Sequence, residues 1–312
     1  GVLRNIAREL SHLQYPDEKL EPVRFLEVTY SVPVWMAEQW IADYGFKQTK
    51  QICKSFFVES PITIRTNLLR IQPAALKKRL EEEGVTVKEV PALSYAFEIS
   101  GFDYLQSLKC FDEGLFYVQD ISSMMVAEVA APKLGSYIID VCAAPGGKSS
   151  HLAEKLEGTG MVEARDLTEY KVSLIEENIE RHGLENMNTV QMDATQLDEG
   201  SVNKADVLIC DLPCSGLGVM GKKTDIRYKM TAEKQQDLVM LQREILSTVY
   251  SYVKQGGTLV YSTCTIHKGE NEENVEWFLK EHPEFELVSK EQMFPGETYH
   301  DGFFIAKMIR RT

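Results

Sequence analysis

The sequence at residues 138–148 is Ile138-Ile139-Asp140-Val141-Cys142-Ala143-Ala144-Pro145-Gly146-Gly147-Lys148. An apolar run enters a turn of small residues here, and a helical pattern follows the turn. Small residues let the backbone approach a ligand, and the first turn of the helix presents free N–H groups. The segment therefore predicts the first strand–turn–helix crossover of a ligand-binding α/β sheet.

After this crossover, short apolar runs alternate with helical patterns, as a parallel sheet covered by helices requires. Because no helix separates the last two runs, they should pair as an antiparallel hairpin at the sheet edge. The pattern predicts an α/β, Rossmann-like fold with a seven-stranded, mostly parallel sheet. Its strands are expected at Tyr137–Val141, Met161–Arg165, Thr189–Met192, Ala205–Cys210, Gly257–Ser262, Phe285–Val288 and Gly302–Lys307, and its helices at Lys148–Leu156, Glu169–Arg181, Glu233–Val253 and Glu270–Glu281.

The sequence before this region has a different character and predicts a small α+β module. We expect residues 1–20 to form a helix and a linker, residues 21–118 the α+β module, and residues 119–312 the α/β domain. The module's predicted helices are Val34–Tyr44 and Pro73–Glu83, and its predicted strands are Ile62–Arg65, Val85–Val90 and Ala96–Ile99.

Composition excludes several classes of protein. A chain of 312 residues with 44% hydrophobic content can bury a large core. No apolar run approaches the roughly 20 residues of a membrane helix, and the first residues lack a signal-peptide pattern, so we expect a cytosolic protein without a membrane partner. The six cysteines lack the spacing of a disulfide framework, and no metal site is expected.

The formal net charge of −13 argues against a protein that grips nucleic acid with its whole surface. Most of the excess negative charge lies after residue 118, so any polyanion-binding surface must be local. Two clusters qualify, although each alone is better explained as a solvated face. They are Arg65, Arg70, Lys77, Lys78 and Arg79, and Lys222, Lys223, Arg227 and Lys229.

The glycine turn lacks the features of two common nucleotide sites. A phosphate-binding loop needs glycine where Cys142 stands, and the dinucleotide pattern of three spaced glycines is absent. Asp166, Asp193 and Asp211 instead follow the next three predicted strands, where a helix-capping role is the alternative for each alone. Together they predict a nucleoside pocket without phosphate-binding groups, which fits S-adenosylmethionine better than ATP or NAD.

Two thiols follow the fourth and fifth predicted strands, in Asp211-Leu-Pro-Cys214-Ser215 and Tyr261-Ser-Thr-Cys264-Thr265. Both lie in polar turns, whereas Cys53, Cys110 and Cys210 are better explained as buried residues. A thiolate that adds to carbon 6 of cytosine makes carbon 5 nucleophilic enough to accept a methyl group. An acid such as Asp211 could stabilise the adduct through the ring's N3/N4 edge. This chemistry needs one thiol and does not choose between the two.

Three motifs together resemble the signatures of the RNA (cytosine-5) methyltransferase family, which includes the bacterial 16S rRNA methyltransferase B proteins and the eukaryotic Nop/Sun proteins. The similarity extends to residues 65–67, 117–123 and 301–307 and covers essentially the whole chain. It implies a class I methyltransferase fold preceded by a small RNA-positioning module. The motifs are Asp140–Lys148, Asp211–Gly218 and Tyr261–Thr265.

The resemblance also implies roles for individual residues. Cys264 would be the nucleophile, Cys214 its helper, and Asp211 a further catalytic group, while residues 222–229 would form a mobile loop near the substrate. The residues implied to contact S-adenosylmethionine or the target base are Cys142, Ala143, Ala144, Pro145, Gly146, Gly147, Lys148, Asp166, Asp193 and Asp211.

The implied substrate is RNA, with 16S rRNA and its cytosine 967 as the specific expectation. Residues 1–8 resemble the end of a NusB-like RNA-binding domain that precedes the catalytic part in these proteins. We expect a monomer that does not act on DNA. Two alternatives stay open: an enzyme acting on tRNA or another rRNA site, and a catalytically silent RNA-binding or assembly factor, which the presence of both thiols and all the acids disfavours.

Overall fold

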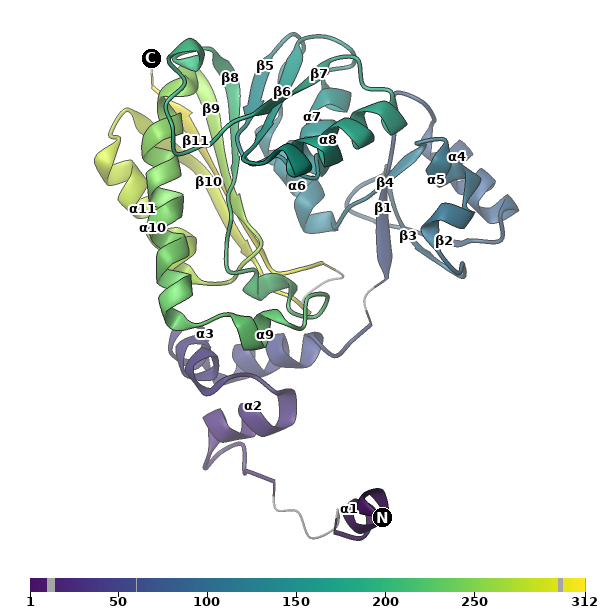
Figure 1. Cartoon of the computed structure of the whole chain (residues 1–312), viewed down its shortest axis with the longest axis vertical. Coiled ribbons are helices and arrows are strands. Elements are labelled where there is room, and N and C mark those ends of the chain that lie inside the picture. Colours follow the sequence, from purple (N-terminus) through teal and green to yellow (C-terminus); the bar gives the residue numbers. More distant parts are fainter. Residues whose placement is uncertain (10–14, 60, 297–299, 312) are drawn as a thin grey trace.

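The computed structural model describes residues 1–9, 15–59, 61–296 and 300–311, and Figure 1 shows how its elements are arranged. A seven-stranded sheet has the order β10-β11-β9-β8-β5-β6-β7. Strands β5 to β9 pair in parallel, and β11 is antiparallel to both β9 and β10. Its strands are β5 (Tyr137–Asp140), β6 (Met161–Asp166), β7 (Met187–Gln191), β8 (Ala205–Asp211), β9 (Val253–Thr263), β10 (Phe285–Met293) and β11 (Phe303–Arg310).

The predicted fold class, strand number and terminal hairpin are therefore confirmed. Strand β5 pairs with β6 on one side and with β8 on the other. The connections that leave the carboxyl ends of β5 and β8 therefore run in opposite directions along the sheet. In an open α/β sheet this point of divergence is where ligands bind. The segment 138–148 lies there.

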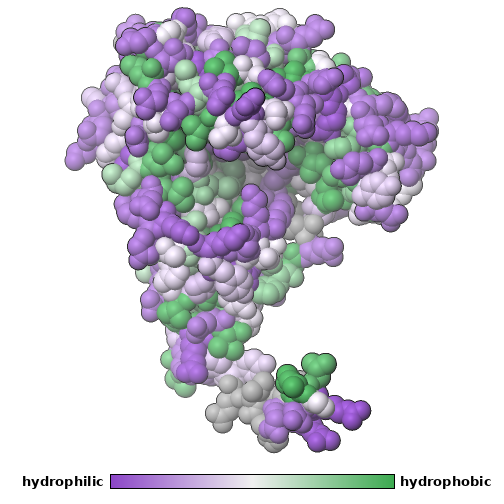
Figure 2. Space-filling view, in the orientation of Figure 1, coloured by the Kyte–Doolittle hydropathy of each residue, from purple (hydrophilic) through white to green (hydrophobic). Residues whose placement is uncertain are grey.

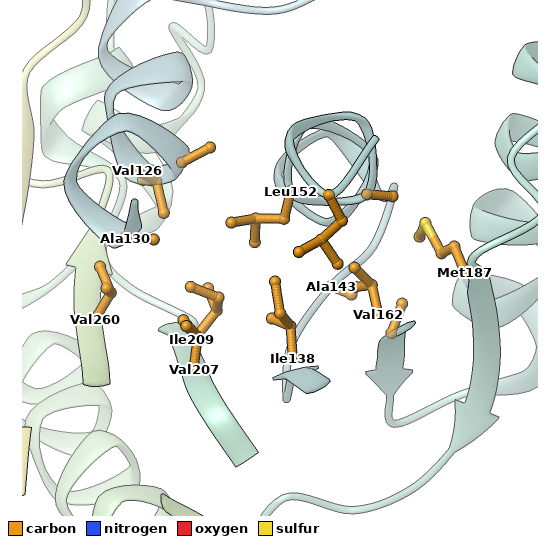
Figure 3. Close-up of a cluster of buried hydrophobic side chains, with 14 of the residues drawn as sticks. Val126, Ala130, Ile138, Ala143, Leu152, Val162, Met187, Val207, Ile209 and Val260 are labelled. Carbon is orange, nitrogen blue, oxygen red and sulfur yellow. The ribbon is translucent and has the colours of Figure 1, made fainter. Parts of the chain in front are cut away.

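Helices cover both faces of the sheet. One face packs against α6 (Ile121–Ala130), α7 (Gly147–Lys155) and α8 (Glu169–His182), and the other against α10 (Ala232–Val249) and α11 (Glu272–Glu281). Figure 3 shows Leu152 of α7 and Val126 of α6 packed over Ile138 and Ile209 of the sheet. Because side chains alternate along a strand, neighbouring residues of β5 and β8 face opposite cores, as burial on both faces requires.

A second sheet forms a separate lobe of residues 62–118, which we call the four-stranded lobe (Figure 1). Its order is β2-β3-β1-β4 with antiparallel neighbours. The chain passes twice through a strand–helix–strand arrangement, and both helices cover one face of the sheet over Ile64, Phe97 and Phe116. Its elements are β1 (Ile62–Thr66), α4 (Pro73–Glu82), β2 (Thr86–Glu89), β3 (Ala96–Ser100), α5 (Lys109–Asp112) and β4 (Phe116–Val118).

The first helices lie apart from this lobe. Helix α1 (Val2–Glu9) has no buried residue, whereas α2 (Pro22–Tyr30) and α3 (Val34–Ser55) form a core with the segments that follow β8 and β9. We expected the helix that starts at Val34 to end at Tyr44. Helix α3 instead bends at Gly45, whose φ of 75° and ψ of 160° are not helical, and then continues to Ser55. None of the helices in the described ranges has the length and apolar character that a bilayer crossing needs.

The four-stranded lobe is joined to the α/β domain by buried polar contacts. Arg65 of β1 is fully buried and forms an ion pair with Glu154 of α7, with 2.5 Å between Nη1 and Oε2. The Arg65 guanidinium also lies over the Tyr117 ring, and that ring stacks on His182 of α8 with centroids 3.5 Å apart. Both interpretations of Arg65, as part of a solvated face and as part of a polyanion-binding surface, are therefore wrong, because this cation is buried and holds two parts of the fold together.

Candidate active site

The turn between β5 and α7 is shaped by backbone hydrogen bonds to the end of β6. The N–H of Ala143 donates to the Arg165 carbonyl at 2.8 Å, and the N–H of Ala144 donates to the Asp166 carboxylate at 3.0 Å. Gly146 has a φ of 102°, a conformation that favours glycine. Within the part of the chain that the structure describes, the N–H groups of residues 147–149 meet no protein acceptor, which leaves the start of α7 free for a ligand.

The three acids predicted to line the nucleoside pocket lie in different environments. Asp166 is buried, and it accepts hydrogen bonds from the N–H groups of Ala144 and Leu167 and from Lys171. Asp193 is exposed, and hydrogen bonds from Thr195 lower its pKa. Asp166 thus stabilises the turn, and Asp193 closes a turn of its own after β7.

Asp211 ends β8 and is a quarter exposed. Its carboxylate lies 2.7 Å from Nζ of Lys148 and accepts a hydrogen bond from Oγ of Ser262, also at 2.7 Å. The last residue of β8 is therefore connected both to α7 and to the end of β9. This places an acid and a lysine at the centre of the sheet's carboxyl edge, beside the free end of α7.

Two further groups of the turn face inward. Asp140 is buried, and this burial raises its pKa to about 7, while Oγ of Ser149 donates a hydrogen bond to it at 2.5 Å. Burial also raises the pKa of Cys142. Cys142 is therefore held as a neutral thiol and is unsuited to act as a nucleophile.

The two predicted thiols meet at the carboxyl edge of the sheet. Sγ of Cys214 lies 3.1 Å from Sγ of Cys264, and each residue is partly exposed. Their strands, β8 and β9, are parallel neighbours, as the sequence predicted. By contrast Cys53, Cys110 and Cys210 are buried, which confirms that part of the prediction.

The surroundings of the two thiols differ in charge. A hydrogen bond from Cys214 lowers the pKa of Cys264, and the Lys148 and Lys223 cations act in the same direction against burial and Asp211. The pKa of Cys214 is raised by its hydrogen bond to Cys264, by burial and by the nearby Glu270 carboxylate. Cys264 is therefore the thiol that the site favours as a thiolate, which is the nucleophilic form.

The segment after Cys214 is held close to the end of β9 and to the start of β11. The N–H of Gly218 donates to the Cys264 carbonyl at 3.1 Å, and the N–H of Gly302 donates to the Gly218 carbonyl at 3.0 Å. Lys222 lies 2.9 Å from Asp120 and 2.8 Å from Asp301, so its ammonium joins three segments of the chain.

Gly218 leaves no space for a side chain. A Cβ at this position would lie 2.0 Å from the Gly302 carbonyl oxygen, which belongs to the backbone. An alanine side chain at this position would push the start of β11 away from the segment after Cys214. Gly218→Ala should therefore lower turnover roughly 100-fold, the effect of a displacement of about 1 Å in a catalytic site. Initial rates of the methyl transfer that the sequence predicts would measure this effect.

Gly200→Ala is the matched control, because the atoms nearest to its Cβ belong to the Asp198 side chain and not to the backbone. Turnover of the control should stay close to that of the unchanged protein. Equal turnover in both variants would show that the close approach at Gly218 has no part in shaping the site.

A cavity of about 540 Å³ borders this segment and is lined by parts of α3, residues 218–222 and residues near the start of β11. Its lining has mixed charge, with Lys54 and Lys222 beside Glu59 and Asp301. Figure 2 shows that the molecule is hollowed between the seven-stranded sheet and the four-stranded lobe.

The remaining cations of the two predicted clusters are mostly paired. Arg79 pairs with Glu113 and Lys77 with Glu89, while Lys229 pairs with Asp225. Arg227 is buried, with Nη1 donating to the Tyr30 carbonyl at 3.2 Å. Neither cluster is thus an unbroken cationic surface.

Sequence reasoning missed several polar residues that shape this site. Ser215, Ser262 and Glu270 hold the strand ends in place, and Gln119 links Arg65 to the start of α6. The only available signal was that both serines lie in the thiol-containing segments, Ser215 directly after Cys214 and Ser262 two residues before Cys264. Glu270 was assigned only to the start of a helix.

The sheet order, the glycine turn at its point of divergence and the acids at the strand ends are those of an S-adenosylmethionine-dependent methyltransferase. The chain belongs to the 16S rRNA methyltransferase RsmB/F family, whose model matches residues 127–309. A second model, the ferredoxin-like domain of RsmF/B-like methyltransferases, matches residues 32–102. The predicted family, enzyme class and cofactor are confirmed, and the chain is an RNA methyltransferase.

Named relatives support this assignment. The chain is 35% identical to the probable ribosomal RNA small subunit methyltransferase B of Bacillus subtilis, across all of this chain and 73% of the relative. It is 37% identical to the tRNA (cytosine(72)-C(5))-methyltransferase of Pyrococcus horikoshii, across 65% of this chain and 54% of the relative. A solved methyltransferase homolog protein from Pyrococcus horikoshii matches with a TM-score of 0.81 and 27% identity, covering 91% of this chain and 97% of that one.

Proposed function

We propose that the chain methylates carbon 5 of a cytosine in RNA through a covalent bond between Cys264 and carbon 6 of the base. The observation that carries the proposal is the pair of thiols, 3.1 Å apart, at the edge where the glycine turn also ends. A methyltransferase that acts on an oxygen or an exocyclic nitrogen needs no thiol, since these atoms are nucleophilic themselves. Carbon 5 of cytosine needs one.

The first step is addition of the Cys264 thiolate to carbon 6. The electron pair of the ring's carbon 5–carbon 6 bond then makes carbon 5 a nucleophile. Residues 142–148, with Asp166 and Asp193, would hold S-adenosylmethionine, which would supply the electrophilic methyl group and leave as S-adenosylhomocysteine. Asp211, beside Lys148, is placed to hold the N3/N4 edge of the ring and to stabilise the adduct.

In the second step a general base takes the proton from carbon 5, and the bond from carbon 6 to Cys264 breaks. The electron pair of the carbon 5–hydrogen bond restores the ring double bond, and Cys264 leaves as a thiolate. A hydrogen bond from the Cys214 thiol stabilises that leaving group, because the two sulfurs lie within contact distance. Cys214 therefore acts as the helper in product release.

The RNA is proposed to be 16S rRNA, with cytosine 967 as the target. The four-stranded lobe, together with the helices that precede it, forms the RNA-positioning part of residues 21–118. Its fixed attachment to α7 through Arg65 and Glu154 keeps its orientation to the cofactor turn constant. We also propose that the protein works as a monomer in the cytosol.

Methyl transfer to 16S rRNA, 23S rRNA and tRNA transcripts tests the substrate. We expect 16S rRNA to be the preferred acceptor, with 5-methylcytosine mapped to the target position. Preferred methylation of tRNA, which the name of the archaeal relative makes the main alternative, would contradict the choice of rRNA while leaving the chemistry intact. A methylated base other than cytosine would contradict the proposed reaction.

A further inference from the structure

Glu270 is a fully buried acid that the proposed chemistry does not use. It lies in a single helical turn, residues 268–270, between β9 and α11. Its Oε2 accepts hydrogen bonds from the N–H of Ser215 at 2.8 Å and from Nε2 of Gln242 at 3.0 Å. Its Oε1 accepts one from Oγ of Ser215 at 2.5 Å and lies 3.2 Å from Nδ1 of His267.

These contacts reach the chain next to each active-site thiol. Ser215 follows Cys214 directly, and Thr265 follows Cys264 directly. Oγ of Ser215 lies 2.8 Å from Oγ1 of Thr265, so one buried carboxylate connects the two turns. Because the N–H and the hydroxyl of Ser215 both donate to Glu270, the backbone and the side chain of that serine are fixed at the same time.

The other side of Cys214 is held by the same network. Nε2 of Gln242 in α10 donates to the Pro213 carbonyl at 2.8 Å as well as to Glu270. The carbonyl of Glu270 in turn accepts a hydrogen bond from Tyr261 of β9. The turn that carries Cys214 is therefore clamped between α10 and the end of β9, whose places are seen in Figure 1.

We infer that Glu270 is a positioning residue that keeps the Cys214 thiol against Cys264 during release of the methylated base. The inference rests on the proposed function, in which Cys214 stabilises the departing Cys264 thiolate. Cys264 follows a central strand and is held by its own carbonyl contact to Gly218. Loss of Glu270 therefore frees Cys214 more than Cys264.

Loss of Glu270 should therefore slow elimination more than it slows addition and methyl transfer. Addition of Cys264 and methyl transfer need Cys264 in place, whereas elimination also needs Cys214. In Glu270→Gln the new amide nitrogen cannot accept: at the Oε2 position it removes the acceptor of both the Ser215 N–H and Gln242, and at Oε1 it removes the acceptor of the Ser215 hydroxyl. The methylated RNA should then stay bound to Cys264 for longer.

The test uses Glu270→Gln and Ser215→Ala with unmodified cytosine RNA and S-adenosylmethionine. We expect the first methyl transfer per enzyme to keep its rate within about threefold, and steady-state turnover to fall about 10- to 100-fold, as for a displaced catalytic group. Gel electrophoresis under denaturing conditions should show a covalent enzyme–RNA complex that the unchanged protein does not accumulate. A purely structural role would slow both phases equally.

Three further variants complete the design. Ser201→Ala removes another buried serine hydroxyl that donates to a carboxylate, that of Asp198, near the opposite end of β8, and should show normal turnover without a complex. Cys214→Ala should accumulate the complex, and Cys264→Ala should form none.

Normal turnover in both test variants, or equal slowing of both phases without a complex, would overturn the inference. If Cys214→Ala also turned over normally without a complex, the proposed role of Cys214 would fail, and the inference with it. Accumulation in Cys214→Ala but in neither test variant would overturn the inference about Glu270 alone.

Discussion

Replacing Cys264 with alanine should lower methyl transfer to RNA by at least about 10³-fold, because in the proposed mechanism Cys264 makes the bond to carbon 6. Cys214 is not an equivalent substitute, since its pKa is raised by the hydrogen bond to Cys264, by burial and by Glu270. Cys264 is partly exposed, so its truncation should change the free energy of unfolding by no more than about 1 kcal/mol. Transfer of labelled methyl groups measures the first effect, and urea denaturation measures the second.

Cys210→Ala is the matched thiol control. Cys210 lies on β8 close to Cys214, but it is buried in the core and takes no part in the proposed chemistry. Its truncation should cost some stability and leave methyl transfer within a few-fold of the unchanged protein. More than a tenth of normal activity in Cys264→Ala would mean that the nucleophile is another group.

Replacing Arg65 with methionine should lower the free energy of unfolding by about 3–5 kcal/mol, the usual effect of removing one partner of a buried ion pair. The variant leaves Glu154 buried without its cation. Burial already raises the pKa of Glu154 despite Arg65, so without Arg65 this carboxyl should bind a proton more readily. The destabilisation should therefore be greater at pH 8 than at pH 6, as urea denaturation at the two pH values would show.

The double variant Arg65→Met with Glu154→Leu provides the control. Apolar residues of similar volume often replace a buried ion pair at little or no cost. The double variant should therefore recover most of the lost stability. A loss below about 1 kcal/mol in the single variant would show that this ion pair does not hold the four-stranded lobe to α7.

The seven-stranded sheet could be predicted because each strand is an apolar run bounded by polar or glycine-containing turns. Strands β5 and β6 begin where the pattern placed them, whereas β7 begins at Met187, two residues before the expected Thr189. Boundaries are less certain than elements because the apolar period weakens at strand ends. Strand β4 (Phe116–Val118) was missed because a three-residue strand is too short for its pattern to be recognised, and helix α6 (Ile121–Ala130) was missed as well.

Packing between distant segments could not be predicted. Helices α2 and α3 form a core with Leu217, Met220 and Ile266. These three residues come shortly after the two thiols in the sequence, and they are far in sequence from the two helices. Arg65 is the clearest example of this limit. Nothing in the sequence around Arg65 indicates that its acidic partner is Glu154 of α7.

The candidate site was predictable where residues follow strand ends. Parallel neighbours bring such residues to one edge, so the meeting of Cys214 and Cys264 followed from the order of two strands. The acids were harder to place. Asp166 and Asp193 both follow strands, but only the structure shows that the first supports the turn and the second is exposed. Glu270 follows no strand end and could not be identified in this way.

The most direct test of the account is to incubate the protein with S-adenosylmethionine and RNA that carries 5-fluorocytosine at the target position. Fluorine cannot leave carbon 5 as a proton does, so elimination stops and the covalent bond to the protein remains. Digestion and mass spectrometry should find the nucleotide on the peptide that contains Cys264. Attachment to Cys214, or no adduct under conditions in which the RNA is bound, would contradict the proposed mechanism.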